Sequence, residues 1–111
     1  MRKLIVIAIA TGALAMLAAG AMAATSVKVG DDYYVRPSGV PTVNVKKGAT
    51  VRWRFVGDSP HSVTVSKGPA KFNSGLRDSG TYSKKLRKRG TYTIYCTIHG
   101  ASDQKMKLIV K

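Results

Sequence analysis

The chain has 111 residues and a formal net charge of +14, with 19 lysines and arginines against five acidic residues, all aspartates. This length excludes two ordinary domains. The charge favours anionic partners, but no nucleic-acid-binding motif is recognisable, so we expect no nucleic-acid partner.

The N-terminal stretch has the layout of a secretory signal peptide. Arg2 and Lys3 form a positive region, residues 4–17 are apolar, and Ala21-Met22-Ala23 is an A-x-A cleavage site. We therefore expect a signal peptide over residues 1–23, one domain over residues 24–111, and a location in the periplasm or on the extracytoplasmic face of the envelope. Retention of the apolar segment as an anchor stays open. Loss of Arg2 and Lys3 takes the net charge from +14 to +12.

The rest of the chain reads as short strands. The clearest run, Thr50 to Val56, places Val51, Trp53 and Phe55 on one face and two arginines on the other, which is the period of a half-buried strand. Residues 67–78 are rich in turn residues and read as a long loop that crosses between sheets. No helical period follows residue 24. About eight such runs predict an all-β sandwich or barrel.

The chain contains one cysteine, Cys96, and two histidines, His61 and His99. One thiolate and two imidazoles are the ligand set of a trigonal type 1 copper site, which needs only a weak axial fourth ligand. Taken singly, each residue has a structural alternative: a hydrogen-bonded histidine, or a cysteine that packs as a small apolar residue. In an exported chain, however, a lone cysteine points to a reactive thiol, an intermolecular partner or a metal ligand.

Strand alternation places these residues together. His61 shares a face with Val63 and Val65, and Cys96 shares a face with Ile94, so both side chains point towards the core. Both lie at strand ends, and His99 follows in the next loop. We expect all three at one end of the sandwich.

Four segments carry a resemblance to a known family. They are Val45-Lys46-Lys47-Gly48, Val51-x-Trp53, Pro60-His61, and Gly90-Thr91-Tyr92-x-x-Tyr95-Cys96-Thr97-Ile98-His99. Together they resemble the plastocyanin/azurin family of cupredoxins over the whole mature chain. The resemblance implies a Greek-key β-sandwich that binds one copper ion at one end, with His61, Cys96 and His99 as equatorial ligands.

The sequence departs from the family at the axial position. Plastocyanin-like members have a methionine five residues after the second histidine, where this chain has Gln104. Met106 has the same inward parity but requires a longer loop. We favour Gln104 as the axial neighbour, with Met106 as the alternative and no close axial ligand as a third possibility. Zinc, which also binds cysteine and histidine, is the alternative metal.

The resemblance implies a one-electron carrier that cycles between Cu(II) and Cu(I), and not an enzyme. A copper storage or delivery protein without a redox partner is the alternative. We expect a monomer whose redox partners dock near His99. Tyr95, with outward parity, is either an ordinary strand aromatic or a second route to copper through Cys96.

A basic turn precedes the cysteine strand. It contains Lys84, Lys85, Arg87, Lys88 and Arg89. Cys96 lies seven positions after Arg89, which is more than about 20 Å of extended chain. The turn is therefore expected at the end opposite the copper, either as a solvated turn or as a tether to an anionic surface.

Overall fold

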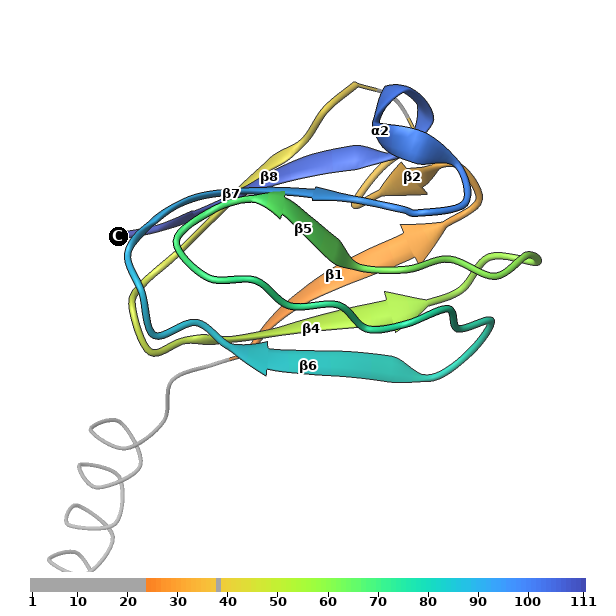
Figure 1. Cartoon of the computed structure of the whole chain (residues 1–111). Helices are drawn as coiled ribbons and strands as arrows, with labels where there is room; N and C mark the ends of the chain where they lie inside the picture. Colours follow the sequence, from red (N-terminus) through yellow and green to blue (C-terminus); the bar gives the residue numbers. More distant parts are fainter. Residues whose placement is uncertain (1–23, 38) are drawn as a thin grey trace, which may run out of the picture.

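A computed structural model describes residues 24–37 and 39–111 (Figure 1). The predicted signal peptide, residues 1–23, lies outside the described residues. The elements are β1 (Thr25–Gly30), β2 (Tyr33–Tyr34), β3 (Thr42–Val45), β4 (Thr50–Phe55), β5 (Thr64–Lys67), β6 (Thr81–Lys85), β7 (Gly90–Tyr95), the short helix α2 (Gly100–Asp103) and β8 (Lys105–Val110). In the described part of the chain, no helix is long and apolar enough to cross a membrane.

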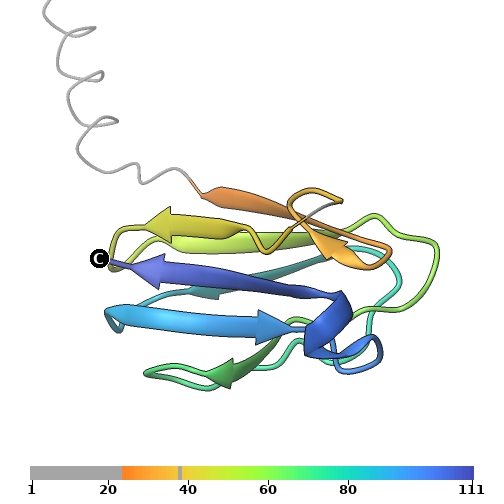
Figure 2. The same ribbon diagram turned by 90° about the horizontal axis from the view of Figure 1, so that it is seen from above.

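The strands form two four-stranded sheets that pack face to face (Figure 1), and Figure 2 shows them from above, with the sheet that contains β7 and β8 in front. One sheet has the order β2-β1-β4-β6 and the other β3-β8-β7-β5. β1 pairs with β4 in parallel, β3 pairs with β8 in parallel, and the other neighbours are antiparallel. The chain crosses repeatedly between the sheets, and the connection from β5 to β6 is one such crossing. The all-β sandwich expected from the sequence is confirmed.

The core lies between the sheets and follows the predicted alternation. In β4, Val51, Trp53 and Phe55 are buried and the two arginines between them are exposed. Trp53 is fully buried, and its ring nitrogen donates to the sulfur of Met106 in the opposite sheet, at 3.5 Å. A tryptophan buries about 200 Å², which stabilises the fold by roughly 5 kcal/mol before entropic costs. Trp53 thus fixes the two sheets against each other.

The two ends of the sandwich differ in chemistry. β1, β4 and β7 finish at one end, where Gly30, Tyr95 and α2 lie; we call it the site end (right in Figure 1). The turns between β3 and β4 and between β6 and β7, together with Lys111, form the other end (left in Figure 1). The basic turn is therefore at the end opposite Cys96.

Candidate metal centre

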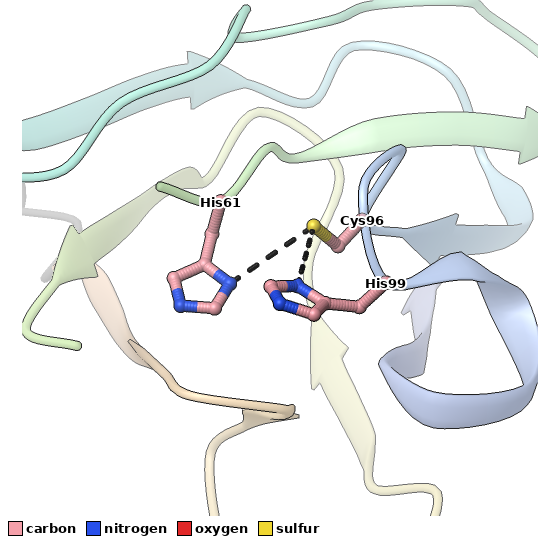
Figure 3. A group of neighbouring side chains, drawn as sticks. All are labelled: His61, Cys96 and His99. Atoms are coloured by element: carbon pink, nitrogen blue, oxygen red, sulfur yellow. Dashed lines mark hydrogen bonds between the residues drawn. The ribbon is translucent and has the colours of Figure 1, made fainter. Parts of the chain in front are cut away.

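Three potential ligand side chains meet at the site end (Figure 3). Cys96 Sγ lies 3.3 Å from His99 Nδ1 and 4.0 Å from His61 Nδ1. One donor atom from each residue lies within 4.8 Å of the others. The two imidazole rings are 4.8 Å apart, centre to centre. The residues that the sequence predicted to converge are thus brought together, from three separate segments.

His61 comes from the connection between β4 and β5. Its backbone N–H and carbonyl exchange hydrogen bonds with Arg77, both at 2.9 Å, so the long loop after β5 fixes its position. The ring itself is fully buried. Gly57 lies against the ring, because a Cβ there would collide with His61 Nε2 and with the carboxylate of Asp31. A glycine is needed for this close approach.

Cys96 and His99 are positioned by a tight turn after β7. Gly100 N–H donates to the carbonyl of Cys96 at 2.8 Å, and Gln104 N–H donates to the carbonyl of Gly100 at 3.0 Å. The first bond closes the turn that precedes α2, and the second makes the single turn of α2 itself, which the sequence did not predict because four residues show no helical period. Gly100 has φ +79°, which favours glycine. The turn folds His99 back over Cys96.

The Cys96 thiol is fully buried. Burial opposes its ionisation, but hydrogen bonds from the backbone of His99 and Ser62 and from the His99 side chain outweigh burial, and the pKa of Cys96 is lowered. Ser62 is itself held by hydrogen bonds to Thr97. Because the thiolate is the form that binds metal, the environment favours ligation.

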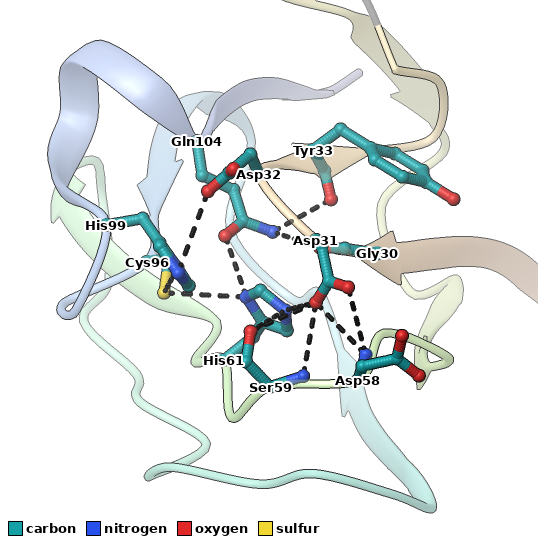
Figure 4. A network of polar contacts seen from close by, with 10 residues as sticks. All are labelled: Gly30, Asp31, Asp32, Tyr33, Asp58, Ser59, His61, Cys96, His99 and Gln104. Carbon is teal, nitrogen blue, oxygen red and sulfur yellow. Dashed lines mark hydrogen bonds and ion pairs between the residues drawn. The ribbon is translucent and has the colours of Figure 1, made fainter.

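Gln104 reaches the cluster, as Figure 4 shows, and is 1% exposed. Its amide nitrogen donates to the backbone carbonyls of Gly30 at 3.0 Å and Tyr33 at 2.8 Å. Because these two carbonyls hold the amide nitrogen away from the cluster, the amide oxygen Oε1 faces the cluster and lies 2.9 Å from His61 Nδ1.

Met106 is also fully buried, but its sulfur accepts the hydrogen bond from Trp53 in the core. The two candidates for the axial position therefore have different surroundings. The Gln104 amide lies against His61, whereas the Met106 thioether is engaged with the tryptophan that joins the sheets.

Asp31 is a site residue that sequence reasoning missed, since Gly30-Asp31-Asp32 reads as a plain turn. Its Oδ1 accepts from His61 Nε2 at 2.9 Å, and the carboxylate also accepts from the backbone of Asp58 and from Ser59 (Figure 4). The hydrogen bond from His61, followed by those from Asp58 and Ser59, holds the pKa of Asp31 far below its ordinary value. The only signal in the sequence was the position of this turn at the end of a strand.

The contact with Asp31 determines which nitrogen of the His61 ring is available to a metal ion. A carboxylate only accepts hydrogen bonds, so His61 Nε2 carries the hydrogen and Nδ1 faces Cys96. A carboxylate on the outer nitrogen is the usual support of a metal-bound histidine. A second carboxylate, Asp32, lies 3.6 Å from His99 Nε2.

The donor set fits copper. One thiolate, two imidazole nitrogens and a weaker oxygen at the axial position are the ligands of mononuclear electron-transfer copper sites. Structural zinc sites are usually tetrahedral and use several cysteines, whereas the chain has only one.

Comparison with known proteins supports the same assignment. No protein-family model and no curated protein matches the sequence. Among solved structures, a methionine-to-glutamine mutant of amicyanin with Cu(I) matches with 28% identity and a TM-score of 0.65, over 79% of this chain and 82% of that one. The reduced state of a proline-to-phenylalanine mutant of amicyanin matches with 27% identity and a TM-score of 0.65, over 85% and 89%.

The chain is a cupredoxin. The resemblance drawn from its motifs is confirmed by the fold and by the cluster of His61, Cys96 and His99. Tyr95 of this cupredoxin is half-buried on β7, with its backbone paired to Thr64 and Lys105. It lies next to Cys96 on the opposite face of the strand, as its parity predicted.

Proposed function

We propose that this cupredoxin is a small exported electron carrier that holds one copper ion between His61, Cys96 and His99, with Gln104 Oε1 as the weak axial donor. The observation that carries the proposal is the convergence of the three strong donors at one buried point. Copper bound there would supply the one-electron couple between Cu(II) and Cu(I).

The protein's part is to hold the ligands still. Asp31 fixes the ring of His61, the turn before α2 fixes Cys96 and His99, and two carbonyls fix the amide of Gln104. Ligands on a rigid β frame move little when the charge of the site changes, which suits rapid electron transfer. The burial of Cys96 and His61 also keeps water away.

His99 marks the place where a redox partner would approach. Its side chain is 23% exposed, whereas the side chain of His61 is 1% exposed. Ile98, next to His99, and Leu76, next to the Arg77 bridge, are both more than half exposed. Apolar side chains around an exposed ligand edge allow close contact that is readily broken. We infer that redox partner proteins dock here and that the cupredoxin meets them as a monomer.

A copper storage or delivery protein is the second candidate. Such carriers often present methionines at the surface, but Met106 is the sole methionine after residue 23 and is fully buried against Trp53. No feature of the site suggests a substrate-binding or proton-transfer role, and we propose no enzymatic activity.

Voltammetry of the copper-loaded protein tests the proposal. An electron carrier gives a reversible one-electron wave that survives many cycles with copper retained. Release of copper on reduction would favour delivery. Detection of the protein in a periplasmic or envelope fraction, with Ala24 as its first residue, tests the proposed export.

A further inference from the structure

The end of the sandwich opposite the metal site has a high density of positive charge. Three segments meet there. Gly48 N–H donates to the carbonyl of Leu86 at 2.6 Å, and Leu86 N–H donates to Ala49 at 2.9 Å, which joins the β3–β4 turn to the β6–β7 turn. Lys47 N–H donates to the carbonyl of Lys111 at 2.9 Å, which adds the end of β8.

We call this surface the basic end. Its exposed cationic side chains are Lys46, Lys47, Lys85, Arg87, Lys88, Arg89 and Lys111. These residues come from the β3–β4 turn, the β6–β7 turn and the end of β8. Because the three segments are joined by hydrogen bonds, their cationic side chains form one surface.

The acidic residues lie at the other end of the molecule. Asp31 and Asp32 follow β1, Asp58 follows β4, Asp78 precedes β6 and Asp103 precedes β8. Within residues 24–37 and 39–111, the ion pairs join histidines to aspartates, and no lysine or arginine is paired. The charges of the basic end are therefore free to meet an external anion.

A small hollow opens in the basic end. It has a volume of about 180 Å³ and lies between the segment of Ala70 and Phe72 and the segment 84–88. Phe72, Leu86 and Tyr92 supply apolar walls, and the Lys84 ammonium lies 5.7 Å from the centre of the Phe72 ring. An apolar hollow with a cationic rim suits an amphiphilic anion better than a purely polar one.

The connection to the N-terminal segment points to the same partner. Thr25, the first residue of β1, pairs with Val51, and Val51 pairs with Lys84 on its other side. The described domain therefore begins close to the basic end, and the predicted N-terminal segment with its apolar residues 4–17 precedes it in the sequence. Before the proposed cleavage ahead of Ala24, an apolar segment held in a membrane would bring this end of the domain to the bilayer surface.

We propose that the basic end docks on an anionic phospholipid bilayer and leaves the site end turned away from the membrane. Lipid phosphates meet the lysines and arginines, and acyl or glycerol carbon meets the hollow beside Phe72. Each basic residue near an anionic bilayer strengthens binding roughly fivefold. Salt screens the attraction, so binding weakens as ionic strength rises.

Vesicle binding of residues 24–111 tests this surface. The core extends from Val27 to Val110, so this part has the core of an independent domain. The basic-end variant carries Lys85→Gln, Arg87→Gln and Lys88→Gln, and the matched control carries Lys28→Gln, Arg54→Gln and Lys105→Gln. Both variants lose three charges, but the control loses them towards the site end.

At low salt, the wild type should bind phosphatidylglycerol vesicles and not phosphatidylcholine vesicles. The basic-end variant should bind about 100-fold more weakly, since three fivefold losses multiply, and the control should lose less than about tenfold. No binding by the wild type, or equal losses in the two variants, would overturn the proposal. Tighter binding to soluble polyphosphate than to vesicles would make this a polyanion site and would also overturn it.

Lysine acetylation read by mass spectrometry tests the orientation. On vesicles, Lys46 and Lys88 should be protected while Lys28 and Lys105 stay reactive; the opposite pattern would refute the proposed orientation. Both experiments use metal-free protein, so their outcome is independent of electron transfer at the copper site.

Discussion

Replacing Gln104 with methionine is the sharpest perturbation of the site. The Gln104→Met change removes an amide oxygen that lies 2.9 Å from His61 Nδ1 and substitutes a softer thioether. A softer axial donor favours Cu(I) over Cu(II), so we expect the reduction potential to rise. The same change removes the two hydrogen bonds from the amide nitrogen to Gly30 and Tyr33.

Both effects have a size. For a one-electron couple, each tenfold change in the ratio of Cu(I) to Cu(II) affinity moves the potential by about 59 mV. If the replacement changes this ratio by roughly ten- to 100-fold, the potential rises by about 60–120 mV. In the metal-free protein, the two carbonyls lose their donor, and the free energy of unfolding should fall by about 2–4 kcal/mol.

Voltammetry and urea unfolding measure the two effects separately. Met106→Leu is the matched control, because Met106 contacts Trp53 in the core. The control should keep its potential and lose about 1 kcal/mol of stability. An unchanged or lower potential in Gln104→Met, or a comparable rise in Met106→Leu, would refute the assignment of Gln104 as the axial donor.

Three further changes follow from the contacts. Asp31→Asn removes the charge that supports His61 Nε2. Competitive titration should show that the affinity for Cu(II) falls by roughly ten- to 100-fold. An unchanged affinity would count against the supporting role of Asp31. Gly90→Ala places a Cβ 2.5 Å from Pro69 at a residue with φ +141°. Urea unfolding should show that the free energy of unfolding falls by about 1–3 kcal/mol, while the copper spectrum stays the same. A variant as stable as the wild type would refute the steric argument. Copper at 1,000 times its dissociation constant should stabilise the fold by about 4 kcal/mol, so removal of copper by a chelator should lower Tm. A Tm that is the same with and without copper would contradict metal binding to the folded state.

Much of the architecture was predictable because side chains alternate along a strand. The alternation around Trp53 indicated a buried face, and the same rule pointed His61 and Cys96 inwards, as the structure confirms. The crossing after β5 was also predictable, because residues 67–78 are rich in turn residues and their length allows the chain to change sheets.

The parts that escaped prediction depend on contacts distant in sequence. Asp31 lies 30 positions before His61, and only the pairing of β1 with β4 brings its turn against the ring. Gln104 and Met106 share one face of the chain, so alternation cannot distinguish them. Their surroundings differ because Gln104 directly follows α2, where its amide lies against His61. Met106 lies two residues further along the chain, in β8, and its sulfur contacts Trp53 in the core.

Addition of Cu(II) to the metal-free protein tests the central claim most directly. If Cys96 is a ligand with His61 and His99, one equivalent of Cu(II) should produce an intense visible absorption from thiolate-to-copper charge transfer. The Cys96→Ser variant, confirmed as folded by circular dichroism, should lack this band. A wild-type protein that binds Cu(II) without the band, or a band that persists in Cys96→Ser, would contradict the account.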